Sequence, residues 1–169
     1  MNPSPLCASL LAKIREQIER TTHLINLAPP GSLDWKPPVP NAWPVAILFG
    51  HLLESVAGFC AVLAAVEPHR LAPFAELRSL PVNHACLPRE AAERLALYRD
   101  RIQEGFALLD DVRLAQPVAT VFVEDGEPLL TLLLGNLEHL INHKHQLFTY
   151  LKLMGVGVNT ADLYRFRGA

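Results

Sequence analysis

The sequence predicts an all-α protein, a four-helix bundle whose helices are joined by long, proline-rich connections. Four long stretches repeat apolar side chains at helical spacing, and prolines and glycines concentrate between these stretches. One run of β-type composition has no evident pairing partner, so it cannot make a sheet. With 169 residues, half of them hydrophobic, the chain is predicted to form one domain that spans residues 1–169.

The first two helices are predicted from apolar periodicity and from the prolines that bound them. Residues 5–27 place leucine and isoleucine at helical spacing among charged residues, and the sequence Ala-Pro-Pro-Gly at 28–31 ends this helix. A proline-rich connection leads to the second helix, which begins near Trp43 and Pro44 because proline is favoured in a first helical turn. This helix is apolar around most of its circumference and stops before Pro68.

The third helix begins near Pro88 and covers the sequence LPREAAERLALYRDRIQEGFALLDD. Residues 118–124 (VATVFVE) favour an extended segment or half of a small hairpin, and the sequence DGEP at 125–128 predicts a turn. The fourth helix, residues 129–154, has no proline and is apolar on several sides, so more than one neighbour should bury it. Two short helical turns are predicted outside these helices, around residues 71–78 and 160–164.

Composition excludes several classes of protein. The 15 Lys and Arg residues nearly balance the 17 Asp and Glu residues and form no basic tract, which argues against binding nucleic acid through its phosphates. The three cysteines have no CxxC spacing and fit a reducing cytosol better than a disulfide scaffold. The N-terminus lacks the basic segment of a secretory signal, and no window has the length of a membrane span without a charge or a histidine. We therefore expect a soluble, cytoplasmic protein that binds neither nucleic acid nor membrane.

Three histidines stand out on the predicted helices. His139 and His143 lie one turn apart on the same face of the fourth helix, a spacing that suits one metal ion. His51 lies in the middle of the second helix with little polar company nearby in the sequence. Burying three imidazoles without ligands or partners would be costly, and a shared divalent cation would satisfy all three. The alternative is that each is a core histidine hydrogen-bonded to a neighbour.

At these positions the chain resembles the DinB-like (damage-inducible) superfamily of metal-binding four-helix bundles, over nearly its whole length. Three elements carry the resemblance: the segment DWKPPVPNAWPVA, the HL pair in FGHLLES, and HLINHKHQLFTYLKLMGV, in which the family usually has H-x-x-x-H-R-G-Q. The resemblance implies that His51, His139 and His143 are the metal ligands, that the helices run up-down-down-up, and that the protein is a homodimer. His145 replaces the usual glycine; it lies about 200° around the helix from His143, so it should face away from the ion and could touch a partner subunit.

A site of three neutral histidines would leave the full charge on the ion and at least one coordination position open. The pKa of a bound water would then fall towards about 7, and a bound thiol would ionise. Such an open site is typical of a catalyst or a ligand-binding protein, because structural zinc sites normally have four protein ligands. The expected metal is Zn²⁺ or Ni²⁺, since imidazole suits both.

Other side chains are weaker candidates for a role at this site. Gln146 lies on the ligand face and could hydrogen-bond a bound water or substrate, or be a buried structural amide. Glu54 follows His51 by one turn and could be a carboxylate partner of the site or a general base, or be simply solvated. Tyr150 is expected in the core, and residues 121–123 could form a lip over the metal or an ordinary loop. The remaining candidates are expected on the surface, in loops or as core filler: His23, His69, His84, Cys60 and Cys86.

Three functional hypotheses follow. The resemblance implies an enzyme, a metal-dependent thiol S-transferase or hydrolase that acts on a small molecule, with a low-molecular-weight thiol as the partner in the first case. The second hypothesis is a non-catalytic, stress-associated binding or structural protein in which the metal stabilises the bundle. The third is a helical interaction module whose histidines merely pack in the core.

Overall fold

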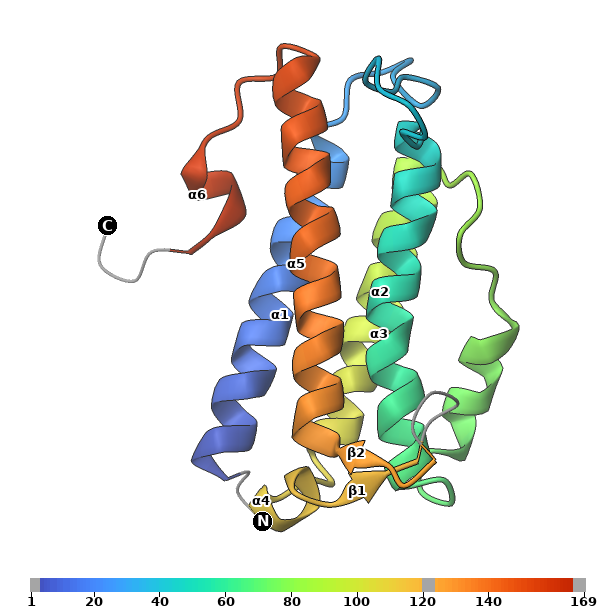
Figure 1. The fold of residues 1–169 in the computed structure, drawn as a ribbon, viewed down its shortest axis with the longest axis vertical. Coiled ribbons are helices and arrows are strands. Elements are labelled where there is room, and N and C mark those ends of the chain that lie inside the picture. Colours follow the sequence, from blue (N-terminus) through green and yellow to red (C-terminus); the bar gives the residue numbers. More distant parts are fainter. Residues whose placement is uncertain (1–3, 120–123, 166–169) are drawn as a thin grey trace.

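A computed structural model describes residues 4–119 and 124–165 and shows a bundle of four long helices (Figure 1). These helices are α1 (Pro5–Asn26), α2 (Val45–Val66), α3 (Pro88–Phe106) and α5 (Leu129–Leu153). In Figure 1 the chain runs upwards through α1, downwards through α2 and α3, and upwards again through α5. The predicted all-α bundle and its up-down-down-up order are confirmed.

The bundle has a closed cross-section, because α2 packs against α3 and α5 while α1 packs against the same two helices. Among the described residues, α2 alone has the length and hydropathy of a membrane span, yet 61% of its apolar window is buried inside the bundle. The apolar character of α2 is therefore explained by its two helical neighbours and by the coil that crosses it.

The long connection before α2 is attached to the start of that helix. Pro44 at the N-cap position has no side-chain acceptor for the first backbone amides of α2. Two backbone carbonyls of the connection replace it: Val45 N donates to Trp35 O (3.0 Å) and Ala46 N donates to Leu33 O (2.9 Å). The proline-rich segment is therefore held beside the upper end of α2.

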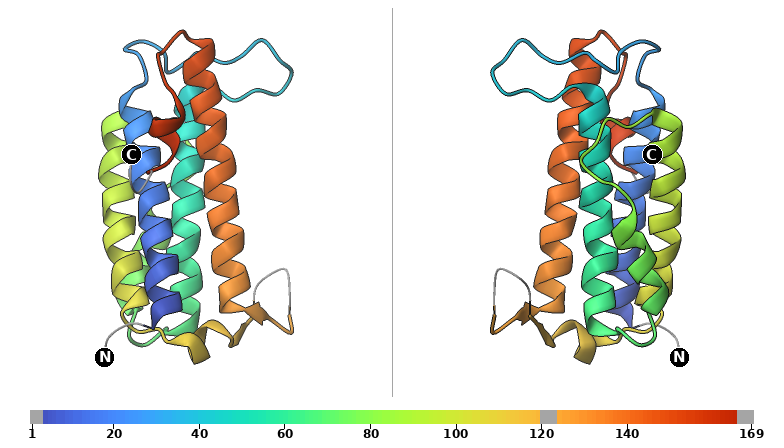
Figure 2. Two further views of the ribbon diagram at one scale, coloured as in Figure 1. Left: turned by 90° about the vertical axis from the view of Figure 1, so that its left-hand side faces the viewer. Right: turned by 90° about the vertical axis from the view of Figure 1, so that its right-hand side faces the viewer.

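The connection between α2 and α3 runs back along the length of the bundle. It contains the 3-10 helix η1 (Ala72–Ser79), in the region where a short turn is predicted, and then a coil that passes over α2 (Figure 2). Asn83 N donates to Gly50 O (3.1 Å) and Cys86 N donates to Ala46 O (3.0 Å). A Cβ on Gly50 would lie 2.1 Å from the carbonyl oxygen of His84, so this close approach requires glycine.

The third helix is shorter than predicted. Instead of continuing through residue 111, α3 ends at Phe106, and Leu108 N and Leu109 N make tight i→i−3 bonds beyond it. A separate short helix, α4 (Asp111–Leu114), begins after Asp110, whose carboxylate accepts a hydrogen bond from Arg113 N (2.8 Å). Asp110 is thus a helix cap rather than part of the third helix.

Short elements complete the lower end of the bundle and the C-terminal segment. Strands β1 (Pro117–Val118) and β2 (Glu127–Pro128) pair antiparallel just before α5, so a small hairpin forms at the start of the 118–124 segment. Residues 120–123, which include the predicted lip at 121–123, lie outside the described residues. The helix α6 (Thr160–Leu163) confirms the short turn predicted there.

Candidate metal centre

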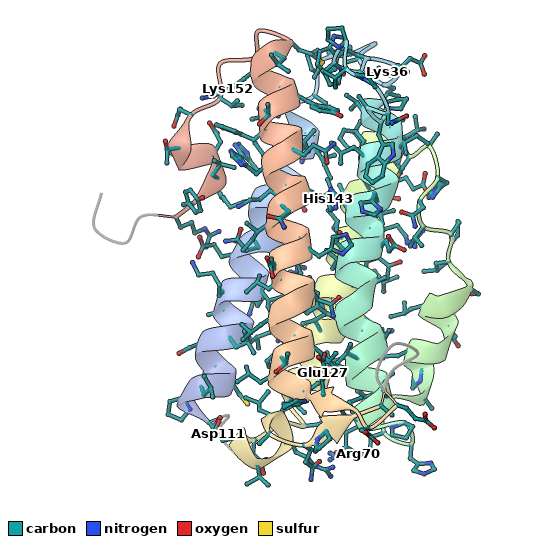
Figure 3. All side chains as sticks on the ribbon, in the orientation of Figure 1. Lys36, Arg70, Asp111, Glu127, His143 and Lys152 are labelled. Atoms are coloured by element: carbon teal, nitrogen blue, oxygen red, sulfur yellow. The ribbon has the colours of Figure 1, made fainter. Side chains whose placement is uncertain are left out.

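Three imidazole rings meet where α2 faces α5. His51 comes from α2, and His139 and His143 come from α5, one helical turn apart; Figure 3 labels His143 at this interface. The Nε2 atom of His51 lies 3.0 Å from Nε2 of His143 and 3.1 Å from Nε2 of His139. All three rings are half-buried. Each therefore directs the same nitrogen towards one common point.

The other nitrogen of two of these rings is held by acceptor groups. His51 Nδ1 lies 2.7 Å from Asn83 Oδ1 and 3.0 Å from Glu54 Oε2. His143 Nδ1 lies 3.0 Å from Gln146 Oε1. Because these oxygens can only accept, the Nδ1 atoms of both rings carry the hydrogen. A neutral imidazole has one N–H, so Nε2 of His51 and Nε2 of His143 present lone pairs to each other.

Two lone pairs at this distance repel each other unless a cation lies between them. A proton is a poor candidate, because burial lowers the pKa of both His139 and His143 and the neighbouring His51 lowers it further; in His143 the Gln146 contact opposes this only in part. Nitrogen ligands bound at 2.0–2.1 Å to one divalent ion would lie about 2.9–3.4 Å apart. The observed Nε2–Nε2 separations of 3.0 and 3.1 Å fall within that range, so the donor set fits such an ion.

Aromatic rings of the proline-rich connection cover one side of the histidine cluster. The Trp43 ring lies 4.6 Å from the His51 ring and stacks at 5.7 Å on the His143 ring, between centroids. Trp35 meets the Tyr150 ring edge-on at 5.4 Å. Trp43 is itself 37% exposed, so a molecule in solution can reach this aromatic cover.

The structure brings both weaker candidates to the cluster, each on the outer nitrogen of a ring. Gln146 contacts His143 and Glu54 contacts His51, so each is placed to orient a ring rather than to face the point where the three nitrogens meet. The expectation that His51 has little polar company was wrong, because Glu54 and the coil residue Asn83 both contact it. Tyr150 is buried as expected, and its hydroxyl also accepts a hydrogen bond from Gln146 Nε2 (3.1 Å).

His145 lies away from the cluster, as its place on the helix predicts. It is exposed and stacks on Phe148, with 5.8 Å between ring centroids.

Asn83 and Lys144 are not among the residues that the sequence motifs single out. Asn83 belongs to no motif; it reaches His51 only because the coil crosses α2, and its left-handed backbone (φ 57°) is one that asparagine tolerates. Lys144 is 1% exposed and its Nζ donates to Leu163 O (2.9 Å) and to Gln17 Oε1. Its burial could have been foreseen, because it lies on the same helical row as the buried residues Leu140, Leu147, Phe148 and Leu151.

Comparison with known proteins agrees with this architecture. A family model that describes the DinB superfamily matches residues 13–147. The chain is similar to the crystal structure of a DinB-like protein from Bacillus subtilis, with a TM-score of 0.69, 18% identity, and coverage of 93% of this chain and 99% of that one. A structure assigned to the DinB family from Exiguobacterium sibiricum gives a TM-score of 0.62, 20% identity, and coverage of 95% and 99%. No curated protein matches the chain in sequence.

Proposed function

Because the chain belongs to the DinB superfamily and brings three imidazoles together, we propose that it binds one divalent metal ion through Nε2 of His51, His139 and His143. The observation that carries the proposal is the pair of Nε2 lone pairs that face each other at 3.0 Å. Zn²⁺ and Ni²⁺ are the expected ions, because neutral imidazole is a good ligand for both.

Metal analysis tests this site. Tag-free protein is stripped with a chelator, supplied with Zn²⁺ or Ni²⁺, and dialysed, and the metal content of wild type is compared with that of His143→Ala and His139→Ala. Each variant should contain one metal ion per chain fewer than wild type. The matched control is His145→Ala, which removes an exposed imidazole from the same helix and should change nothing. Equal metal content in wild type and in the His143→Ala and His139→Ala variants would refute the proposed site.

The reaction proposed for this site is metal-dependent thiol S-transfer or hydrolysis of a small electrophilic substrate. A divalent ion bound with one position open would lower the pKa of a water or a thiol that occupies that position. Asn83 keeps the hydrogen of His51 on Nδ1, and Gln146 does the same for His143. The Nε2 atom of each ring is then left neutral, with a lone pair that can bind a metal. The Glu54 side chain is 40% exposed and its Oε2 lies 3.0 Å from His51 Nδ1, which supports a role in orienting that ring.

A second candidate function, a non-catalytic protein stabilised by its metal, is favoured by the position of the cluster. The three rings join α2 to α5, two helices far apart in the sequence, so a bound ion would stabilise the folded bundle by mass action. A screen of thiol-transferase and hydrolase substrates separates the two candidates. Turnover that is lost in His139→Ala with helicity preserved supports the enzyme. A melting temperature that rises with metal, without turnover on any substrate, supports the structural protein.

A small-molecule substrate or low-molecular-weight thiol as partner, a homodimer and a cytoplasmic location also belong to this proposal. For the dimer, most leucines of α5 are buried within the monomer, and the exposed apolar residues of that helix are Leu134 and Leu153, 47% and 61% exposed. Light scattering on the purified protein, with and without metal, gives its molar mass. A value of one chain at micromolar concentration would exclude a stable homodimer.

A further inference from the structure

A second group of metal-ligating side chains lies where the coil that crosses α2 enters α3. His84 and Cys86 come from the coil and Glu90 from the first turn of α3, in the sequence pattern H-x-C-x-x-x-E. Their ligand atoms lie within 4.8 Å of one another, and His84 Nε2 is 2.8 Å from Glu90 Oε1. Cys86 is 1% exposed, whereas the side chains of His84 and Glu90 are 30% and 39% exposed. The group is thus packed on one side and open to ions on the other.

The chemistry of this group matches a divalent transition metal. Imidazole nitrogen, thiolate sulfur and carboxylate oxygen are the three ligand types that proteins use for Zn²⁺. An ion at the usual bond lengths would hold its ligand atoms about 3.3–3.6 Å apart, so side-chain adjustments of about 1 Å would bring the three together. From this geometry we propose that His84, Cys86 and Glu90 form a second divalent-metal site, with Zn²⁺ as its expected ion.

The contacts of the three side chains in the described chain also have an ordinary explanation, but it is incomplete. Glu90 accepts a hydrogen bond from Leu87 N at the start of α3 and pairs with His84, while Cys86 Sγ donates to Leu87 O (3.5 Å). This explanation leaves Nδ1 of His84 buried and without a hydrogen-bond partner in the described part of the chain. An ion bound through Nδ1 would give that nitrogen a partner, which the ion pair through Nε2 does not.

The Cys86 thiol is a poor nucleophile in the metal-free protein. Burial, together with the nearby Glu90 carboxylate, raises the pKa of Cys86 to about 12, so the free thiol stays protonated near neutral pH. A divalent ion ionises a thiol that binds it, and the proton passes to solvent. Cys86 and Glu90 also lie at the N-terminus of α3, where the helix dipole favours negative charge.

The site would act on the coil that positions the three-histidine cluster. Asn83, whose Oδ1 accepts from His51 Nδ1 at 2.7 Å, immediately precedes His84. An ion that ties His84 and Cys86 to Glu90 would fix this stretch of coil, and with it the acceptor for His51. The second ion would therefore have a positioning role, whether or not the three-histidine cluster is catalytic.

Cobalt titration tests the second site separately from the first. Co²⁺ is added to the metal-free, reduced protein, and the near-ultraviolet sulfur-to-cobalt charge-transfer band is recorded. The three-histidine cluster contains no sulfur and is silent in this band. Wild type and His143→Ala should both show the band, and Cys86→Ser should lose it. The matched control is Cys60→Ser, which removes another buried thiol with a pKa raised to about 12 and should keep the band.

Absence of the band in wild type at saturating Co²⁺, or its persistence in Cys86→Ser, would overturn the proposal. Because Cys86→Ser could fail to fold, circular dichroism accompanies each variant, and His84→Ala provides a second test that keeps the thiol. His84→Ala should weaken Co²⁺ binding in this band by at least about tenfold. An unchanged affinity in His84→Ala would exclude the imidazole as a ligand and refute the site as proposed.

Discussion

The side-chain oxygen of Gln146 lies 3.0 Å from Nδ1 of His143 and so determines which nitrogen of that ring is free to bind a metal. The amide group of Gln146 is oriented in turn, because its nitrogen donates to the Tyr150 hydroxyl at 3.1 Å. Tyr150 meets the edge of Trp35 in the proline-rich connection. The orientation of one ring of the cluster thus depends on a segment more than a hundred residues earlier in the chain.

Replacing Gln146 should weaken metal binding without removing any of the three imidazoles. We expect Gln146→Ala to lower the affinity about 10- to 100-fold, because His143 loses the acceptor that fixes its tautomer. Competition with a chelator of known affinity measures the change. Gln146→Glu, which keeps an acceptor, should retain most of the affinity, and Asn142→Ala, an exposed site on the same helix, should retain all of it. Wild-type affinity in Gln146→Ala would show that the contact does not orient the ring.

The close approach at Gly50 predicts a linked loss of stability and of metal affinity. A Cβ there would meet the backbone of His84 at 2.1 Å, so Gly50→Ala must push the coil away from α2. We expect a loss of about 1–3 kcal/mol in the free energy of unfolding, and weaker metal binding because Asn83 moves with the coil. Urea unfolding and chelator competition measure the two effects.

Gly135 offers the matched control for this substitution. It lies within α5, and a Cβ there would meet no heavy atom within 4 Å. Gly135→Ala should therefore stabilise the protein by about 0.5–1 kcal/mol and leave metal affinity unchanged. A Gly50→Ala variant as stable as wild type would mean that the coil is not held tightly against α2.

The half-buried rings of His139 and His143 predict a loss of stability in acid for the metal-free protein. Burial lowers the pKa of His139 and His143 below the ordinary value of 6.5. As the pH falls through 6.5, the unfolded chain takes up protons that the folded rings resist, so the free energy of unfolding falls. Urea unfolding at pH 7.5 and pH 5.5, in the presence of chelator, should show a larger fall for wild type than for His143→Ala. Equal falls would indicate that His143 does not contribute.

Lys144 predicts that stability also rises with pH in the alkaline range. Burial lowers its pKa from 10.5 to about 8, so between these values the unfolded chain binds a proton that the folded chain does not. The free energy of unfolding should therefore rise with pH across this window, by roughly 2–4 kcal/mol relative to Lys144→Met. Urea unfolding of both proteins at pH 7.5 and pH 10.5 gives the difference. Parallel pH profiles would show that the Lys144 amine titrates as if it were exposed.

The long helices and the histidine pair could be predicted because their signals are local. Apolar spacing defines a helix within its own sequence, and the i,i+4 spacing of His139 and His143 needs only helical geometry. The contact between Asn83 and His51 depends instead on where a coil crosses α2, which no local pattern specifies. The third helix ends earlier than its sequence predicts for a related reason: Asp110 is compatible with a helix interior, and only the structure shows that it caps the next turn.

The three rings of the cluster are contributed by segments that lie far apart in the chain, since His51 and His143 are separated by 92 positions. Contacts of this separation are costly in chain entropy and form late, after the helices that carry them have docked. During synthesis, α2 is complete long before His143 has been added. The ion proposed for this cluster would therefore be captured by a bundle that is already assembled, and its presence would slow unfolding far more than it would speed folding.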